Sequence, residues 1–253
     1  MALRVNRADS SEISNGTVVT AALSATAGDG FSGSAGAGGS RVFSTEQRTS
    51  GSYSYKLTTV TGNSTILVWS GYASTMLSAS FDFYLTDLPS VTSEISVVYD
   101  NNASIIGRVT ILANGNVGIM EAAGGIVSTL TTGLTADTWY RLEYAIGVGS
   151  GNGIIRVAVY PQASTTAIAS YDNSARNTGT NPIDNIQFGK PVGNSSSPYT
   201  IYLDGLRADD TTTTLLGQDQ LITSKVMYTW TGTVWAPVQL HYYNGSSWRP
   251  IEE

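Results

Sequence analysis

Cysteine is absent from the 253-residue chain, and charge is scarce: 13 lysines and arginines stand against 19 aspartates and glutamates. Without cysteine, neither a disulfide scaffold nor a cysteine-ligated metal site can form. The net charge of −6 argues against nucleic acid as a partner, because nucleic-acid binding usually requires a basic patch. No apolar run approaches the roughly 20 residues that span a bilayer, so we expect no membrane partner.

Histidine is almost absent as well, since His241 is the only one. One histidine cannot supply a histidine-rich metal site, and as a catalytic base it would need a carboxylate that the sequence does not identify. Residues 1–6 contain Arg4 but no apolar stretch behind it, so we expect no secretory signal peptide. This composition indicates a protein made in a cytoplasm but built like an extracellular one.

Hydroxyl side chains are abundant: the chain has 31 serines and 31 threonines, together with 27 glycines and 41% apolar residues. The apolar share is large enough for a sizeable core. The clearest pattern has a period of two, which predicts a strand with one dry and one wet face. In it the apolar Leu77, Ala79, Phe81, Phe83 and Leu85 alternate with Ser78, Ser80, Asp82, Tyr84 and Thr86.

Similar runs recur along most of the chain, and no window has apolar residues at helical spacing. Asn114-Gly115 joins two apolar runs, which predicts a hairpin with a type I′ turn because both residues tolerate positive φ. Many short strands separated by turn residues are typical of a sandwich or barrel. The further strands are expected at 53–57, 105–113, 117–119, 139–146, 153–160 and 201–203.

The composition divides the chain into three parts. We expect a main β domain over 1–210, in which 1–50 contain one early strand near Val18 to Ala22 and a Gly/Ser-rich loop. A threonine-rich linker over 211–222 should follow, and then a distinct tail over 223–253.

The tail contains an internal repeat. Residues 228–238 align without gaps on residues 241–251, and each copy reads as a strand, a glycine turn and a return strand closed by proline. A lone two-stranded hairpin is marginal in water, so the copies must pack on something. Two compatible roles are open for them: a mini-core of tryptophan rings, and docking of the chain in an assembly. The residues predicted for assembly and docking are Trp230, Gly232, Trp235, Pro237, Tyr243, Gly245, Trp248 and Pro250.

The main domain resembles the concanavalin A-like lectin/glucanase jelly roll in its laminin-G-like form. The motifs that carry the resemblance are 51–57 (GSYSYKL), Asn114-Gly115, 138–144 (TWYRLEY) and 201–206 (IYLDGL). Their order and spacing cover roughly residues 10 to 210. The resemblance implies an all-β, two-sheet jelly-roll sandwich, to which the tail adds a small β-hairpin repeat unit.

A second resemblance involves both ends of the chain. Residues 15–20 (NGTVVT) and 28–31 (GDGF) are similar to the opening of virion proteins from tailed phages of actinobacteria, and the tail is similar to the ending of their minor tail proteins. This implies a non-enzymatic virion structural protein, a minor tail component exposed on the particle and bound to other virion proteins. A host-glycan-binding receptor-recognition lectin on the tail, and a capsid decoration or minor capsid protein, remain alternatives.

We also expect a homo-oligomer. The resemblance to virion proteins implies this, because phage fibres and decorations are commonly oligomeric. The composition favours the same expectation, because only Lys56, Lys190 and Lys225 supply lysine, the residue that most often blocks edge-strand pairing.

No catalytic residues are predicted. Retaining glycosidases place two carboxylates about 5–5.5 Å apart, which on one strand requires acids at close even spacing. Glu143 is isolated in the sequence, and Glu94 and Asp100 lie at opposite ends of one expected strand. We therefore expect no enzyme activity, and we expect Asp204 to orient a strand end or a turn.

Two kinds of ligand site remain open. Calcium is a possible cofactor at Asp100-Asn101-Asn102, Asp172-Asn173 or Asp209-Asp210, although these residues also suit ordinary turns; otherwise we expect no cofactor. A host-surface glycan would need exposed aromatic rings beside polar donors, and the alternative for such rings is an ordinary half-buried surface. The rings considered for it are Tyr72, Tyr84, Tyr99, Tyr171 and Tyr199.

Overall fold

The computed structural model describes residues 3–36, 38–122, 124–191 and 198–217, and it gives the strand pairing of four short segments closer to the C-terminus. The chain divides into two compact units, Met1–Gln218 and Asp219–Glu253, which are described separately.

Sheet A is the larger layer of the first unit. Its strands follow the order β13-β12-β11-β6-β15-β4-β3, β1 also pairs with β15, and every pair is antiparallel. The strands are β1 (Arg4–Asn6), β3 (Ser40–Ser44), β4 (Ser54–Thr58), β6 (Met76–Leu85), β11 (Trp139–Gly147), β12 (Ser150–Pro161), β13 (Ala169–Asn177) and β15 (Thr200–Asp209).

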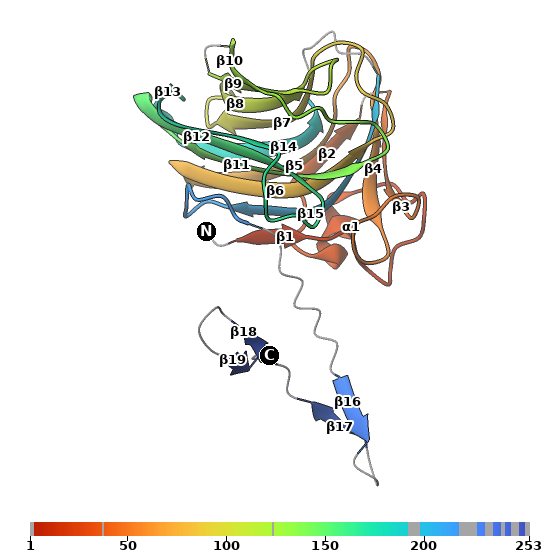
Figure 1. The fold of residues 1–253 in the computed structure, drawn as a ribbon. Coiled ribbons are helices and arrows are strands. Elements are labelled where there is room, and N and C mark those ends of the chain that lie inside the picture. Colours follow the sequence, from red (N-terminus) through yellow and green to blue (C-terminus); the bar gives the residue numbers. More distant parts are fainter. Residues whose placement is uncertain are drawn as a thin grey trace. The chain divides into compact units, whose positions relative to one another are not determined.

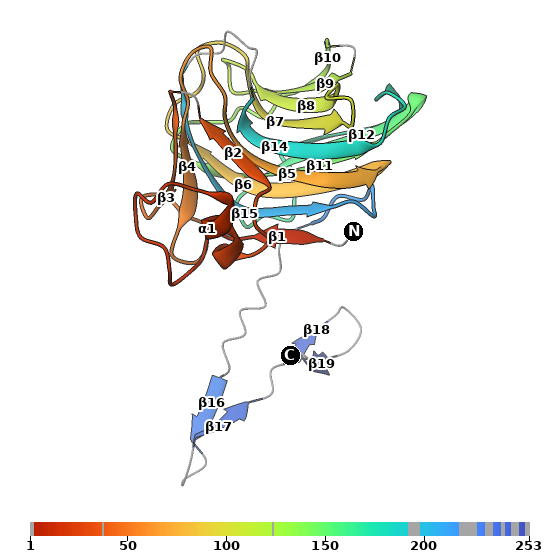
Figure 2. The ribbon, with the colours of Figure 1, turned by 180° about the vertical axis from the view of Figure 1, so that it is seen from behind.

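Sheet B is the second layer, with the order β10-β9-β8-β7-β14-β5-β2 and again only antiparallel pairs. Figures 1 and 2 show the two stacked layers from opposite sides. The predicted fold class, an all-β two-sheet sandwich, is confirmed. The strands are β2 (Gly33–Gly36), β5 (Thr65–Ser74), β7 (Ser93–Asp100), β8 (Ile105–Ile111), β9 (Val117–Glu121), β10 (Ile126–Leu130) and β14 (Ile183–Lys190).

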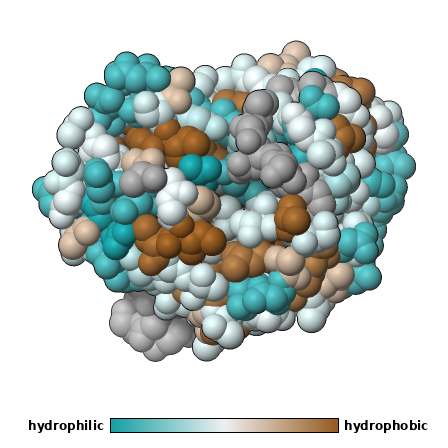
Figure 3. Space-filling model, turned by 90° about the horizontal axis from the view of Figure 1, so that it is seen from above, coloured by the Kyte–Doolittle hydropathy of each residue, from teal (hydrophilic) through white to brown (hydrophobic). Residues whose placement is uncertain are grey.

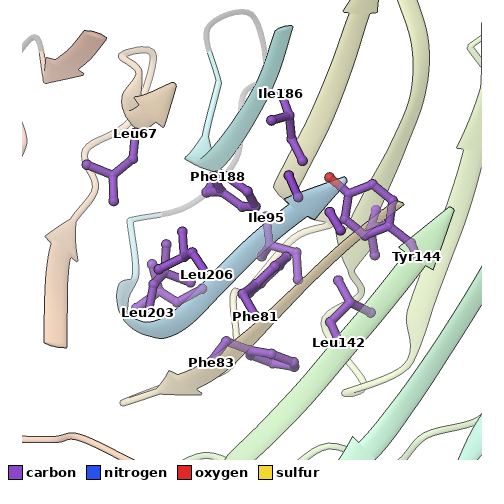
Figure 4. Close-up of a cluster of buried hydrophobic side chains, with 14 of the residues drawn as sticks. Leu67, Phe81, Phe83, Ile95, Leu142, Tyr144, Ile186, Phe188, Leu203 and Leu206 are labelled. Carbon is purple, nitrogen blue, oxygen red and sulfur yellow. The ribbon is translucent and has the colours of Figure 1, made fainter. Parts of the chain in front are cut away.

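The core lies between the sheets and is rich in aromatic rings (Figure 4). Phe81 of β6 packs edge-on against Phe188 of β14, with ring centroids 5.4 Å apart, and Phe188 packs edge-on against Trp69 of β5 at 5.5 Å. All three are fully buried. The period-two pattern along β6 is confirmed on its apolar side, where Leu77, Ala79, Phe81 and Phe83 face this core.

The prediction that serines alternating with the apolar residues face water holds for Ser52, which is exposed, but is wrong for three others. Ser54, Ser78 and Ser80 are at most 1% exposed. Their hydroxyls are covered by chain segments that cross sheet A, as when Ser78 Oγ donates a hydrogen bond to the Thr212 carbonyl at 3.0 Å. The hydrogen bonds of these hydroxyls are therefore made within the protein instead of with water.

The N-terminal fifty residues also depart from the prediction. Val18 makes only an isolated bridge to Val42, and the chain then enters the short helices α1 (Ala21–Ser24) and η1 (Ala25–Ala27). Thr20 caps α1 by accepting a hydrogen bond from Leu23 N at 3.2 Å, a local preference that the strand prediction overlooked. The Gly/Ser-rich segment supplies β2. Within the described residues, no helix combines the length and apolarity that a membrane span needs.

The hairpin predicted at Asn114-Gly115 joins β8 to β9, but its turn is not of type I′. Gly115 has φ +76°, whereas Asn114 keeps a negative φ, and Gly115 N donates to the Leu112 carbonyl at 2.9 Å. A side chain at Gly115 would collide with the Leu134 carbonyl, since a Cβ there would lie 2.3 Å from it. Glycine is therefore required by close approach as well as by φ.

The first half of the predicted linker 211–222 is not a linker. Residues 211–217, which we call the strap, are hydrogen-bonded to sheet A. Arg156 Nη1 donates to the Thr213 carbonyl at 2.8 Å, and Gly217 N donates to Glu143 Oε2 at 3.1 Å. Asp209 Oδ1 accepts from Thr211 N at 2.8 Å and so shapes the turn that begins the strap. Residues 218–222 lie outside the described part.

The second unit contains the two predicted hairpins. Strand β16 (Met227–Trp230) pairs antiparallel with β17 (Trp235–Val238), and β18 (His241–Tyr243) pairs with β19 (Trp248–Pro250). The predicted turn residues Gly232 and Gly245 lie outside the described residues. So do the side chains of Trp230, Trp235, Pro237, Tyr243, Trp248 and Pro250, whose docking role stays a prediction.

Candidate functional site on the sheet faces

The outer faces of the two sheets, and not a patch of exposed apolar side chains, supply the groups of the candidate site. Figure 3 shows hydrophobic areas interspersed with hydrophilic ones on the side seen there. The large apolar side chains that are exposed come from separate parts of the chain. They are Leu3, Val18, Val91, Ile126 and Ile168.

The outer face of sheet A carries an aromatic row. Strand register places Tyr202, Tyr84 and Trp139 side by side on β15, β6 and β11. Tyr84 packs edge-on against Tyr202 at 5.7 Å, and its hydroxyl donates to Asp137 at 2.8 Å. Tyr84 is 7% and Tyr202 3% exposed, so these rings mainly face one another.

A carboxylate pair lies next to the aromatic row. Asp204 of β15 is directly opposite Asp82 of β6. Burial raises the pKa of Asp82 to about 7, and the Asp204 carboxylate adds to the rise. Burial also raises the pKa of Asp204 to about 6, although hydrogen bonds from Thr49, Ser50 and Gly205 oppose it. Like charges in a dry site disfavour two ionised carboxylates.

Asp204 acts as the predicted orienting residue. Its Oδ2 accepts hydrogen bonds from Thr49 N at 2.9 Å, from Thr49 Oγ1 at 2.7 Å and from Ser50 N at 3.1 Å. Its Oδ1 accepts from Gly205 N at 2.8 Å. These bonds hold the loop before β4 against β15.

A buried ion pair adjoins the carboxylate pair, because Arg141 of β11 lies opposite Asp82 and Glu143 lies in the next row. Arg141 Nε donates to Glu143 Oε1 at 2.8 Å, and the two side chains are 5% and 0% exposed. The guanidinium of Arg141 stacks on Tyr160 at 4.2 Å and also donates to the Ser164 carbonyl at 3.0 Å. Glu143, isolated in the sequence, is therefore a paired structural group. Together with the strap, these contacts close much of the outer face of sheet A.

The outer face of sheet B is built differently. Asn185 of β14 lies opposite Tyr99 of β7, and both are half-buried. Gln187 Nε2 donates to Asn185 Oδ1 at 3.3 Å, and Asn185 Nδ2 donates to Asp184 Oδ2 at 3.2 Å. Within the described residues, the hydroxyl of Tyr99 makes no hydrogen bond. These polar groups thus bond chiefly among themselves.

An ion pair lies beside this polar cluster. Arg108 Nη1 of β8 donates to Glu94 Oε1 of β7 at 2.5 Å, and the side chains are 14% and 5% exposed. Burial raises the pKa of Tyr99; the Glu94 carboxylate adds to the rise and Arg108 opposes it. The phenol, the carboxylate and the guanidinium are therefore close enough to interact. We call Tyr99, Asn185, Gln187, Arg108 and Glu94 the open-face cluster.

The arrangement suits hydroxyl-rich ligands. A half-exposed ring can pack against C–H groups, amides can donate and accept, and an ion pair can hold a hydroxyl. The chemistry it offers is binding, because the cluster's one carboxylate, Glu94, is already bonded to Arg108.

The five predicted glycan tyrosines separate into two groups. Tyr72, Tyr84 and Tyr199 are buried, at 4%, 7% and 5% exposed, so the expectation that they offer exposed rings is wrong. Tyr99 and Tyr171 are half-buried. Tyr171 packs on the core from β13 of sheet A, which leaves Tyr99 as the candidate on the open face.

Each of the three calcium candidate segments has an aspartate oxygen engaged in a hydrogen bond. Asp100 Oδ1 accepts hydrogen bonds from Asn102 N and Ser104 N at 2.9 and 2.7 Å, as in a turn. Asp172 Oδ1 accepts from Arg156 at 3.0 Å, and Asp209 Oδ1 accepts from Thr211. Among the described residues, no three acidic or histidine side chains gather as a metal site would require.

Sequence reasoning missed both faces. Asp82 and Asp204 are 122 positions apart, and only strand pairing brings them together. Asn185 and Gln187 likewise come from a strand whose neighbours the sequence does not reveal, and for Arg108 it predicts only the hairpin partner β9. The period-two rule could have placed Asn185 and Gln187 on one face, because they lie two residues apart.

Comparisons with known proteins bear on the fold. No family model and no curated protein matches the chain. The structure of "Cellulose induced protein, Cip1" aligns over 70% of this chain and 88% of its own, with TM-score 0.51 and 16% identity. A Trypanosoma rangeli sialidase in complex with sialic acid aligns over 82% of this chain but 30% of its own, with TM-score 0.51 and 13% identity. These likenesses show the fold.

Proposed function

We propose that the chain is a carbohydrate-binding β-sandwich whose binding surface is the open-face cluster of sheet B. The observation that carries the proposal is the half-buried Tyr99, whose hydroxyl makes no hydrogen bond within the described part of the chain, beside Asn185, Gln187 and Arg108. The two structural neighbours add support, because one is named for induction by cellulose and the other is a sialidase in complex with sialic acid.

The function is proposed to be non-enzymatic. Glycoside hydrolysis needs one carboxyl group as acid and a second as nucleophile or base. Asp204 is fully buried and holds a loop, and Glu143 is bonded to Arg141 and to the strap. These acids are committed to structure, and the open-face cluster offers only the paired Glu94.

Replacing Tyr99 with alanine should weaken glycan binding by at least about tenfold, since aromatic anchors carry much of the energy of a contact surface. A glycan array would first identify a ligand for the full chain, and titration would then compare the variants. Tyr171→Ala is the matched control, because Tyr171 is also half-buried but lies in sheet A. Equal loss in both variants, or no loss in Tyr99→Ala, would contradict the proposed site.

A second candidate function is a structural role in a virion, as a minor tail or capsid component made in the host cytoplasm. The observation favouring it is the separate unit Asp219–Glu253 with its two hairpins, which suits attachment to other virion proteins. Self-association also fits: Lys56 and Lys190 lie in the interior strands β4 and β14, so the edge strands β2, β3, β10 and β13 carry no lysine.

Deleting residues 223–253 should leave a folded, soluble sandwich that no longer enters particles, because the strap ends at Gly217 and stays intact. Circular dichroism and thermal melting would check folding, and complementation of a phage that lacks the gene would check incorporation. Normal incorporation of the truncated chain would contradict the docking role of the hairpins.

A further inference from the structure

We infer that the glycan bound by the open-face cluster is an uncharged, extended chain lying across the strands of sheet B. This inference rests on the proposed function and adds the class of ligand and its direction. Three features carry it: the charge balance of the cluster, its hydrogen-bonding groups and the strand register beneath it.

The charge balance disfavours acidic sugars. In the open-face cluster the guanidinium of Arg108 is the cation, and Glu94 neutralises it through the 2.5 Å bond from Nη1. Asp184 adds a further carboxylate, bonded to Asn185. A sialic or uronic acid carboxylate would meet two anions and one cation already paired with Glu94, and would lose hydration beside them.

The hydrogen-bonding groups favour hydroxyls. Asn185 and Gln187 each carry an acceptor oxygen and two donor hydrogens, and the bond between them uses one donor and one acceptor. The Tyr99 hydroxyl can donate and accept as well. A sugar hydroxyl also donates and accepts, so it matches such groups better than a carboxylate, which only accepts.

The strand register gives the direction and the extent. One cross-strand row runs over six strands, with Val97 and Arg108 in its middle, Gln187 second from one end and the apolar Met120 and Ile126 at the other end. At about 4.8 Å between strands, the row is about 24 Å long, which is more than a single sugar ring can cover. Its members in order are Val68, Gln187, Val97, Arg108, Met120 and Ile126.

Apolar and polar groups alternate from Val68 to Met120 in this row, and Val97 between the two polar groups is fully buried. Val68 precedes Gln187, and Met120 follows Arg108. A pyranose chain likewise presents C–H faces and hydroxyl edges in turn. The end formed by Met120 and Ile126 is therefore assigned to rings beyond the one at Tyr99.

The test begins with an array that carries neutral glycans together with sialylated and uronic acid glycans, probed with the full chain. We expect the bound set to be neutral, and affinity in the best series to rise from two rings to four and six. Preferential binding of acidic glycans, or affinity that does not change with length, would overturn this inference while leaving carbohydrate binding in place. No binding to any glycan would overturn the proposed function and this inference together.

Two variants sharpen the result. Glu94→Gln should free the charge of Arg108 and raise the affinity for uronic acid glycans at least about tenfold, with thermal melting to check the fold. Met120→Ala should weaken six-ring ligands several-fold and leave two-ring ligands unchanged. A Glu94→Gln protein that melts normally but still rejects acidic glycans, or a Met120→Ala protein that loses all lengths equally, would contradict the assignment.

Discussion

Replacing Glu143 with alanine should lower the free energy of unfolding by about 3–5 kcal/mol, because it leaves a buried guanidinium without its partner. The substitution removes two hydrogen bonds: Glu143 accepts one from Arg141 Nε at 2.8 Å and one from Gly217 N at 3.1 Å. The Glu143 side chain is fully buried. Urea unfolding at neutral pH would measure the loss through the shift of the midpoint.

Two controls separate the ion pair from simple cavity formation. The double variant Arg141→Met with Glu143→Leu should recover much of the loss, since apolar residues can replace a buried pair. Glu46→Ala breaks the more exposed pair with Lys56, whose side chains are 53% and 26% exposed, and should cost at most about 1 kcal/mol. A Glu143→Ala loss no larger than the Glu46→Ala loss would contradict the structural role given to the pair.

Replacing Asp82 with asparagine should stabilise the protein at pH 8 and remove most of its stability loss between pH 5 and pH 8. An aspartate has a pKa of about 3.9 when unfolded, whereas burial and the Asp204 charge raise the pKa of Asp82 to about 7. The folded state then binds the proton more tightly. The stability from this proton is fully present below pH 4 and is lost as pH rises through 7.

The size of this effect follows from the shift. One pKa unit is worth about 1.4 kcal/mol, so the total loss from Asp82 is on the order of 4 kcal/mol, of which about 3 kcal/mol falls between pH 5 and pH 8. Urea midpoints at pH 5, 6, 7 and 8 would measure it, with Asp172→Asn as a matched control, since that carboxylate is 65% exposed. A wild-type protein that is more stable at pH 8 than at pH 5 would contradict the carboxylate pair.

The fold was largely predictable from the sequence because its signals are local. The period of two at Leu77–Leu85 needs no knowledge of neighbouring strands, and the turn at Asn114-Gly115 is encoded by adjacent residues. The predictions that failed also have a physical reason. The alternating pattern places Ser78 and Ser80 on a solvent-facing side, but both are buried, and Ser78 is bonded to the strap, which begins at Thr211.

The candidate site was less predictable because it depends on register. Tyr99 could be named as one of five tyrosines, but nothing local distinguishes it from the buried Tyr72 or Tyr199. The pairing of β7 with β14 makes the difference, since it places Asn185 opposite Tyr99. In β7 the period-two rule also fails to assign residues to one face of the sheet, because bulges near Ser96 and Tyr99 break the alternation.

In the proposed function, the two outer faces of the sandwich have different roles, one in stability and one in binding. Sheet A uses its outer polar groups to hold loops and the strap, as Asp204 and Glu143 do. Sheet B keeps its polar groups bonded mainly to one another, as in the contacts of Gln187 with Asn185 and of Arg108 with Glu94. Ligand binding is therefore assigned to sheet B and stability to sheet A.

The most direct test of this assignment is a nuclear magnetic resonance titration of the full chain with its best array ligand, followed through side-chain amide signals. We predict that the signals of Asn185 and Gln187 shift with saturable dose dependence, while that of Asn6, buried at the end of β1 in sheet A, stays in place. Shifts confined to residues of sheet A or of the tail, with Asn185 and Gln187 unmoved, would contradict carbohydrate binding by sheet B.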